Sequence, residues 1–173
     1  MNVKEVMKEY RIATGKHLAQ VPVGRYLSVI VDYNDSIEFL ARGYDFVDSQ
    51  LTEENFPTNG KGIKEIKMDL LSPPVDISGA IVSTNRIYTR LLAAGYRPAT
   101  VKEALAMERI LVLQKYPVVI IGSCYQDLER GWQVPVISYL DFSGEVSRSV
   151  DLTSLDLDFL RYTGRFTVPV VVA

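Results

Sequence analysis

The segment Gly95–Thr100 constrains the fold of this chain more than any other, because it ends one predicted helix and begins another. Gly95 suits the left-handed end of the first helix. Thr100 is a suitable N-cap for the second helix, and Glu103 can reach back to the Thr100 amide, which completes a capping box. The first helix starts near Ser78 or Ser83 and carries Ile87, Leu91 and Ala94 at helical spacing.

After Pro117 the pattern changes to that of β-strands. The second helix is expected to run toward Lys115. Beyond it, short apolar runs alternate with turn residues, as strands do. The expected strands are residues 118–121, 133–140, a third strand after a hairpin turn at 142–145, and 165–172. The sequence therefore predicts an α+β fold in which two consecutive helices are followed by a mainly antiparallel sheet of short strands.

The N-terminal part is expected to add a helix and strand extension. Its elements are a helix up to about Gly15, a strand over 26–31, a short helix capped by Asp35 or Ser36 and ended by Gly43, extended chain over 44–47 and a strand over 66–70. The turn-rich segment 56–62 is the expected internal boundary. At 173 residues the chain favours one domain over 1–173, with subregions 1–56 and 63–173.

Two prolines, Pro135 and Pro169, each lie inside a predicted strand. Because proline lacks the amide that a β-ladder needs, it is tolerated mainly at sheet edges or bulges. We therefore expect that these two strands are not both ordinary central strands.

The charge balance argues against nucleic acid as a partner. The sequence has 19 basic and 21 acidic residues and a formal net charge of -2, so it lacks the basic excess that neutralises phosphates. Lys61, Lys64 and Lys67 form a local basic cluster. They alternate with acidic and apolar residues, so we interpret them as a solvated strand face and not as a phosphate-binding patch.

Cysteine usage and hydropathy indicate a cytoplasmic protein without a membrane anchor. Cys124 is the only cysteine, so the chain can form no internal disulfide, which fits a reducing compartment. Charged residues interrupt residues 1–20, unlike a signal peptide, and no run approaches the roughly 20 apolar residues that cross a bilayer. No motif calls for a cofactor or a metal.

Residues that could do chemistry lack the arrangement that chemistry needs. His17 is the only histidine, and nothing in the sequence pairs it with a serine or with Cys124. Cys124, which follows an apolar strand, is interpreted as a small core residue. The remaining candidate acids are interpreted as residues of solvated faces or of a helical turn: Glu53, Glu54, Asp151, Asp156 and Asp158. These observations argue against an enzyme.

One cluster of side chains has the composition of a recognition surface. Aromatic and arginine side chains are the usual anchors of binding sites, and several gather between the first two C-terminal strands and in a later segment. The candidate binding residues are Tyr125, Asp127, Arg130, Trp132, Arg161 and Tyr162. The alternative is that Trp132 covers one end of the core.

Four short motifs resemble those of an uncharacterised group of bacterial proteins. They are L-T-E-E-N-F-P at 51–57, D-I-S at 76–78, G-Y-R-P-A-T at 95–100 and P-V-V-I-I-G-S at 117–123. The resemblance covers roughly residues 44–173. It implies a shared scaffold and brings no known activity with it.

The helix pair followed by short strands is also similar in layout to C-type-lectin-like domains, including formylglycine-generating enzymes. That resemblance implies a binding scaffold more readily than a chemistry, because the strand loops of such domains accept many ligands. This chain lacks the calcium motifs of the lectins, and Cys124 alone cannot supply the cysteine pair of the generating enzymes. The resemblance therefore implies neither activity here.

We expect a noncatalytic binding or protein-interaction module whose partner is a protein or a small molecule. A small enzyme that assembles carboxylates from separate loops, with Asp127, Asp156 or Asp158, is a second hypothesis. A structural homo-oligomer is a third, because the apolar strand at 168–172 could pair across chains if it lies at a sheet edge.

Overall fold

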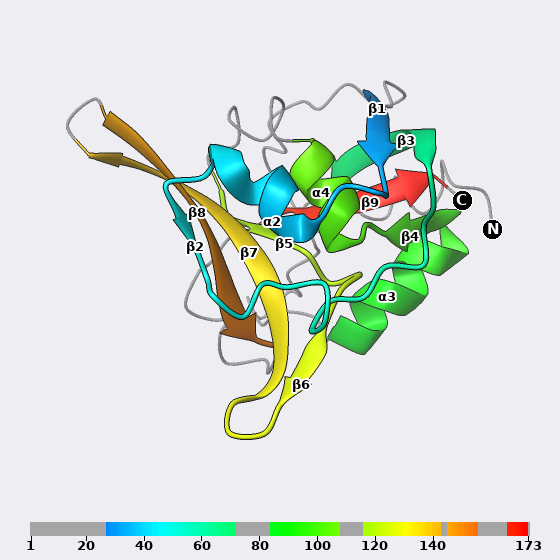
Figure 1. Cartoon of the computed structure of the whole chain (residues 1–173). Helices are drawn as coiled ribbons and strands as arrows, with labels where there is room; N and C mark the ends of the chain where they lie inside the picture. The colour runs from blue at the N-terminus through cyan, green and yellow to red at the C-terminus, as the bar shows by residue number, and fades with distance from the viewer. Residues whose placement is uncertain (1–26, 72–83, 108–115, 143–144, 156–165, 173) are drawn as a thin grey trace.

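The computed structural model describes residues 27–71, 84–107, 116–142, 145–155 and 166–172. The helix expected up to Gly15 lies outside these residues, as do residues 108–115. The second helix, expected to run toward Lys115, ends at Ala106 with Met107 as its C-cap. The described part folds into two β-sheets accompanied by three α-helices (Figure 1), and none of these helices is long and apolar enough to cross a membrane. The predicted α+β class is confirmed.

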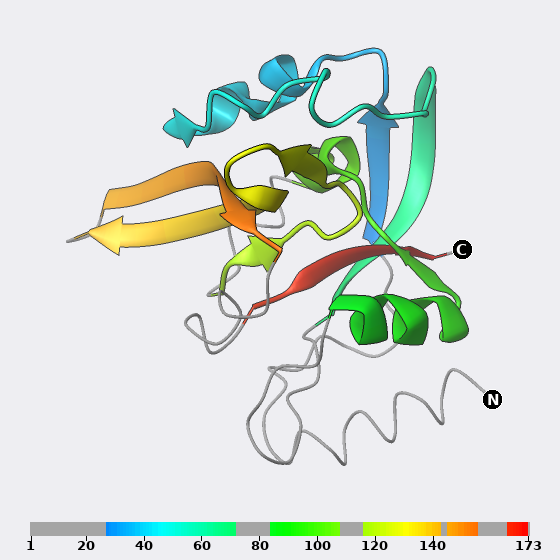
Figure 2. The same ribbon diagram turned by 90° about the horizontal axis from the view of Figure 1, so that it is seen from below.

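Sheet A contains four antiparallel strands in the order β1-β3-β9-β4 within the described ranges. These are β1 (Leu27–Asp32), β3 (Ile63–Leu71), β9 (Val168–Val172) and β4 (Tyr96–Pro98). Two helices lie on its opposite faces, α3 (Thr84–Ala93) and α4 (Val101–Ala106) (Figure 2). The alternation predicted over 66–70 is confirmed in β3, where Met68 and Leu70 are buried while Lys67 is exposed.

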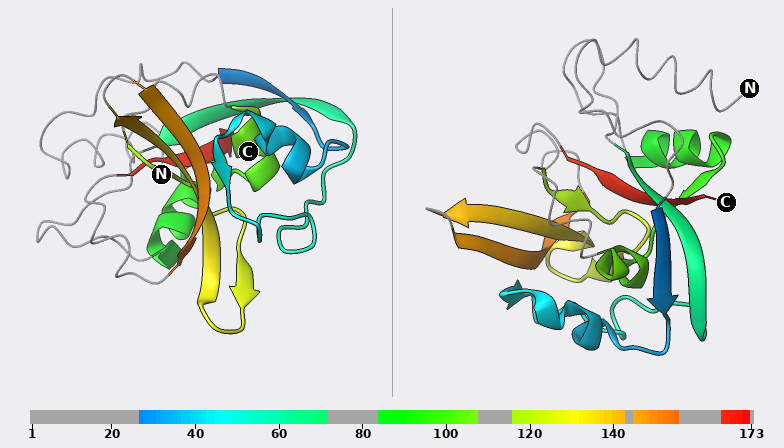
Figure 3. Two further views of the ribbon diagram at one scale, coloured as in Figure 1. Left: turned by 60° about the vertical axis from the view of Figure 1, so that its left-hand side comes forward. Right: turned by 90° about the horizontal axis from the view of Figure 1, so that it is seen from above.

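Sheet B has the order β2-β8-β7-β5, and β6 also pairs with β7. Its strands are β2 (Phe46–Val47), β5 (Val118–Val119), β6 (Tyr125–Asp127), β7 (Gly131–Phe142) and β8 (Glu145–Ser154). The pairing is antiparallel except between β2 and β8. β7 and β8 form the expected long hairpin (Figure 3). A bridge from Val118 to Thr167 joins sheet B to the chain that enters β9.

A short helix, α2 (Ile37–Leu40), follows β1 as the sequence predicts. Of the two candidate caps, Ser36 is the N-cap, and its hydroxyl accepts a hydrogen bond from the Phe39 amide at 3.1 Å. The left-handed helix end expected at Gly43 is wrong. The chain continues from α2 into the 3-10 turn η1 (Ala41–Gly43), which needs no left-handed residue.

The apolar core has two parts, which lie on opposite faces of sheet A. The first packs β1 and β3 against α4 and α2, and the second packs β4 and β9 against α3. Because successive strand residues face opposite sides of a sheet, Val171 belongs to the first part and Val170 to the second. The sequence of a strand in sheet A is therefore continuously apolar only where both faces of the sheet are buried.

The expected joint between the two helices contains a strand. Tyr96–Pro98 forms β4 at an edge of sheet A, paired with β9. Local sequence could not reveal this strand, because its hydrogen-bonding partner is the end of the chain. The flanking predictions are confirmed: Gly95 is left-handed with a φ of 80°, Thr100 is the N-cap of α4, and Glu103 Oε2 accepts the Thr100 amide at 2.8 Å.

Both strand prolines lie in interior strands, which contradicts the expectation for them. Each proline faces the place where a short neighbouring strand ends. The Pro135 carbonyl accepts the Ile120 amide at 2.9 Å just past β5, and the Pro169 carbonyl accepts the Ala99 amide at 2.9 Å just past β4. The N–H and C=O groups of one strand residue point to the same side. The missing amide of each proline would therefore point past the end of the short neighbouring strand, and its absence removes no hydrogen bond from the sheet.

The position of β9 also bears on self-association. β9 lies between β3 and β4, so it presents no open edge to a second chain. The predicted homo-oligomer required residues 168–172 to lie at a sheet edge. Its premise is therefore wrong.

Candidate functional site

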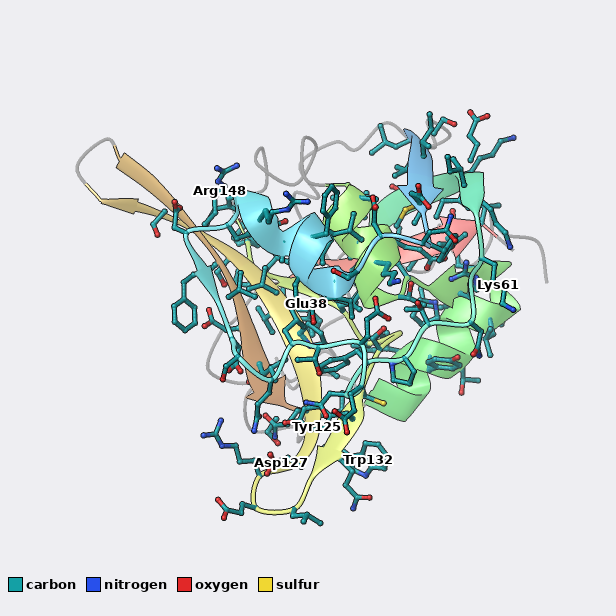
Figure 4. All side chains as sticks on the ribbon, viewed as in Figure 1. Glu38, Lys61, Tyr125, Asp127, Trp132 and Arg148 are labelled. Atoms are coloured by element: carbon teal, nitrogen blue, oxygen red, sulfur yellow. The ribbon has the colours of Figure 1, made fainter. Side chains whose placement is uncertain are left out.

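The hairpin of β6 and β7, residues 125–132, carries four of the binding residues predicted from the sequence. Its turn ends at Gly131, whose φ of 73° is left-handed. The hairpin projects from the body of the protein, and Tyr125, Asp127 and Trp132 lie along it (Figure 4). Arg161 and Tyr162, the other two predicted residues, lie outside the described residues.

Asp127 holds the turn of the hairpin together. Its Oδ1 accepts the backbone amides of Glu129 and Arg130, both at 2.8 Å. Its Oδ2 lies 3.2 Å from the Tyr125 hydroxyl and 3.4 Å from Gln50 Nε2. The amides of Arg130 and Glu129 are the main cause of the lowered pKa of Asp127. Burial, followed by the hydrogen bond to Asp127, raises the pKa of Tyr125.

Apolar side chains of the hairpin face solvent. Leu128, at the tip, is fully exposed, and Trp132 is 50% exposed. The side chain of Arg130 is exposed as well. Trp132 therefore keeps about half of its surface available to a partner while the rest packs on the protein.

A second candidate site is a pocket of about 500 Å³ beside α4. Its walls come from Tyr33 after β1, the loop 56–60, β3, β4, the start of α4 and the segment 122–124. Phe56 belongs to this wall and also stacks edge-on against Tyr125, with ring centroids 5.1 Å apart. The loop that follows Gln50 thus connects the pocket with the base of the hairpin.

Glu103 is the buried carboxylate of this pocket, with its side chain 2% exposed. Its Oε1 accepts the Tyr33 hydroxyl at 2.5 Å and Arg97 Nη2 at 2.6 Å. Its Oε2 accepts Arg97 Nη1 and the Thr100 amide, both at 2.8 Å. Four donors therefore occupy both oxygens, which leaves the carboxylate no capacity to act as a general base.

The protonation states of this network follow from its geometry. Burial alone would raise the pKa of Glu103, but the hydrogen bonds from Arg97, Tyr33 and Thr100 outweigh it and the pKa is lowered. Burial, followed by the hydrogen bond to Glu103, raises the pKa of Tyr33 to about 12. The hydrogen bond to Glu103 raises the pKa of Arg97. At neutral pH the network is an ion pair with a neutral phenol.

Two glycines allow the pocket walls to pack closely. A Cβ at Gly60 would lie 2.0 Å from the Tyr33 ring, and a Cβ at Gly122 would lie 2.3 Å from the carbonyl oxygen of Ala99. Both positions require glycine because of space, since neither has a positive φ. The Tyr33 ring is consequently fixed between the loop and Glu103.

A second buried charge lies next to this network. Lys102, only 4% exposed, donates to the Tyr33 carbonyl at 2.9 Å and pairs with Glu53 at 2.6 Å. Glu53 also accepts the Ile37 amide at 3.1 Å. The sequence interpretation of Glu53 as a helical-turn residue missed this ion pair, which ties the 53 turn and α2 to α4.

The predicted lysine face divides in two. Lys61, Lys64 and Lys67 are all exposed, as a solvated face requires, and Lys61 lies far from the hairpin (Figure 4). Lys64 shares the inner face of β3 with Ile66 and Met68, beyond the end of the core. Its ammonium lies 5.6 Å from the centroid of the Tyr33 ring, and the side chain lines the pocket.

Cys124 lies at the pocket and is exposed, so its interpretation as a core residue is wrong. The chain leaves β5 and turns at 121–124 before β6, which places the thiol outside the sheet. Atoms packed around the sulfur still desolvate the thiolate, and this raises the pKa of Cys124. A protonated thiol is a poor nucleophile.

The acids of the described ranges form no group of three or more side chains that could hold a metal ion. Asp151 accepts the Ser149 hydroxyl at 2.8 Å. Asp156 and Asp158 lie outside the described residues, as does His17. Asp127, the remaining candidate acid of the enzyme hypothesis, already accepts the amides of Glu129 and Arg130, and its second oxygen lies within 3.4 Å of Gln50 Nε2 and the Tyr125 hydroxyl. The enzyme hypothesis stays a prediction, and among the described residues no group of three or more acids supports it.

Comparison with known proteins adds no relative. No protein-family model matches the chain, and no curated protein or solved structure is significantly similar to it. The similarity of layout to C-type-lectin-like domains therefore stays a prediction.

Sequence reasoning grouped Tyr125, Asp127, Arg130 and Trp132 in an expected loop, where the structure forms the β6–β7 hairpin, and it missed the pocket. Glu103 was recognised only as a capping residue, because its partners Tyr33 and Arg97 come from other elements. One signal was available: Lys64 is in phase with the buried residues of β3, and a cation on the inner face of a strand indicates a polar cavity or a partner.

Proposed function

We propose that this protein is a noncatalytic binding module that contacts a protein partner through the hairpin 125–132. The observation that carries the proposal is the exposure of Leu128 and Trp132 on a projecting hairpin whose conformation is already fixed. Apolar anchors that need no ordering on binding give up little conformational entropy, which favours affinity.

The hairpin is held by contacts from within the chain. Asp127 closes the turn, and Gln50 links it to the body through a 2.5 Å hydrogen bond from the Tyr125 hydroxyl. Tyr125 in turn packs on Phe56. These contacts support a recognition surface that is organised before a partner arrives.

The composition of the hairpin favours a protein over a nucleic acid. Tryptophan and arginine are enriched among the residues that dominate protein interfaces, and Trp132 and Arg130 are both exposed. Asp127 and Glu129 place acidic groups at the same turn, where a phosphate backbone would be repelled. A partner with an apolar pocket and a basic rim fits this surface.

Site-specific photo-crosslinking tests the proposal. A benzophenone amino acid replaces Leu128 in the full chain. The variant is expressed in the source organism, and covalent adducts formed on irradiation are detected by their shift in mass. We expect one discrete adduct that diminishes strongly when Trp132→Ala is added. The control carries the same amino acid at Ile30, which is 70% exposed on sheet A, and should give no such adduct.

Absence of a discrete adduct at position 128 would contradict the proposal. So would an adduct of equal intensity at position 30, or one that Trp132→Ala leaves unchanged. A circular dichroism spectrum identical to that of the wild type confirms that each variant is folded.

A further inference from the structure

Hydrogen-bond donors remain unused in the pocket beside α4, while its carboxylate is fully hydrogen-bonded. The two oxygens of Glu103 are occupied by four donors. The hydroxyl oxygen of Ser123 accepts the Val101 amide at 2.9 Å, which leaves its proton to donate elsewhere. The strongest acceptor of the pocket is thus consumed, while donors remain.

Arg97 keeps part of its donor capacity. A guanidinium has five N–H groups. Nη1 donates to Glu103 and to the Pro98 carbonyl, and Nη2 donates once to Glu103. Within the described residues no hydrogen bond is assigned to the Nε–H or to the second Nη2–H, although the Tyr33 hydroxyl also interacts with this guanidinium. These two groups form the other bidentate edge of a guanidinium, which matches an oxyanion.

Lys64 supplies a cation without a carboxylate partner within the described residues. Its neighbour on the pocket wall is the face of the Tyr33 ring, with which it makes a cation–π contact. Lys64 and Arg97 against the single carboxylate of Glu103 leave one net positive charge on the lining. An anion would compensate it.

The size and the apolar wall of the pocket indicate an organic ligand. About 500 Å³ lies within the range of small-molecule sites, roughly 300–1,000 Å³, and exceeds the volume of an inorganic ion. Phe56, Pro57 and the Tyr33 ring provide apolar surface beside the polar groups. Sites of this kind fix the orientation of a ligand with a few placed polar groups.

We propose that this pocket binds a small organic anion whose carboxylate or phosphate group lies between Lys64 and the second edge of Arg97. Arg97 is the positioned donor, because Glu103 fixes its guanidinium through two parallel hydrogen bonds. Lys64 is the adaptable donor, because its exposed side chain forms no other ion pair within the described residues. The site is separate from the hairpin surface.

Benzoate and benzamide test the charge requirement, because they share a shape and differ in charge. Each is titrated into the full-length protein, and amide chemical shifts are followed by NMR. We expect benzoate to shift the amides around Gly60, Lys64 and Ser123 and to bind at least about tenfold tighter than benzamide. Phenyl phosphate, titrated in parallel, shows whether the site prefers phosphate to carboxylate.

Lys64→Met supplies the decisive variant, since it removes the charge, keeps an unbranched apolar stem and breaks no ion pair in the described structure. We expect about tenfold weaker benzoate binding, unchanged binding in the control Lys67→Met, and retained binding in Lys64→Arg. Trp132→Ala should leave benzoate binding intact, which separates this site from the hairpin.

Equal binding of benzoate and benzamide would overturn the proposal. Equal effects of Lys64→Met and Lys67→Met would do the same, as would benzoate shifts confined to amides outside the pocket. None of these results bears on the crosslinking of the hairpin.

Discussion

Glu103 and Asp127 are two carboxylates that accept several hydrogen bonds, one in a buried setting and one on an exposed hairpin. Glu103 accepts four hydrogen bonds, three of them from the side chains of Tyr33 and Arg97. Asp127 accepts two backbone amides, and its other oxygen lies near the Tyr125 hydroxyl and the Gln50 amide. Each has a lowered pKa, and each lies beside a tyrosine whose pKa is raised. The difference is burial: Glu103 is 1% exposed, whereas the hairpin around Asp127 faces solvent.

This difference in burial determines how much each hydrogen-bond network contributes to stability. In a buried site an unpaired charge is costly, so the partners of Glu103 hold the fold together and position Arg97. At an exposed site water replaces any lost partner, so the contacts of Asp127 shape a turn and contribute little stability. A hydrogen-bonded carboxylate thus stabilises the fold in the buried region, and in the exposed region it shapes the turn of the hairpin.

The largest effect is expected from Arg97→Met. This variant leaves Glu103 buried without its cation, and we expect a loss of about 3 kcal/mol in the free energy of unfolding, measured by urea denaturation at pH 7. The value lies at the low end for buried pairs because the Arg97 side chain is 39% exposed. The matched variant Arg130→Met should change stability little, because only the backbone amide of Arg130 contacts Asp127 in the described network.

Acid supplies a second readout of the same variant. In the wild type the pKa of Glu103 is lowered from 4.5, so its contribution to stability is present above pH 4.5 and is lost as the pH falls through the lowered pKa. In Arg97→Met burial dominates, and protonation of Glu103 relieves the unpaired charge. The deficit of the variant should therefore shrink on acidification; a constant deficit would show that lost packing causes it.

The next largest effect is expected from Gly122→Ala. The new Cβ would lie 2.3 Å from the Ala99 carbonyl oxygen, a backbone atom that cannot rotate away. We expect a loss of about 2–3 kcal/mol, measured by thermal or urea unfolding. Gly131→Ala in the hairpin meets no atom within 4 Å and is unfavourable only because of its φ of 73°, so its expected cost is about 1 kcal/mol.

Local patterns predicted the elements whose causes are local. The cap at Thr100, the left-handed Gly95, the short helix after Ser36 and the alternation in β3 each depend on neighbours a few residues away, and all are confirmed. The strand β4 and the interior positions of Pro135 and Pro169 depend on which distant segments become neighbours. Nothing within a short window of sequence specifies that pairing.

The two candidate sites differ in the same way: one is continuous in sequence and the other is assembled by the fold. The hairpin is continuous in sequence, so the grouping of Tyr125, Asp127 and Trp132 could be predicted, although no known relative tests its role. The pocket combines Tyr33, Lys64 and Arg97 from three strand regions, and only the fold brings them to one wall. The position of Lys64, on the same face of β3 as the buried residues, was the one local sequence feature that indicated the pocket.

Tyr33→Phe should have an intermediate effect on the buried network. Loss of the hydrogen bond to Glu103 is expected to cost about 1.5 kcal/mol. Because the pKa of Tyr33 is raised to about 12, its contribution is present below pH 10 and is lost as the pH rises through about 12. The difference in tyrosinate absorbance between wild type and variant should show a single step near pH 12; a step near pH 10 would mean that Tyr33 is not held by Glu103.

The smallest effect is expected from Asp127→Asn, which separates hydrogen bonding from charge. Asparagine keeps an oxygen that can accept the amides of Glu129 and Arg130, so the turn should persist with its amide shifts in place. Unfolding by urea should match the wild type. Glu103→Gln makes the same chemical change in the buried network, where it leaves Arg97 without a counter-charge, and should destabilise the protein clearly. If the two variants lost equal stability, exposure would not be what distinguishes the two carboxylates, and the hairpin would belong to the folding core.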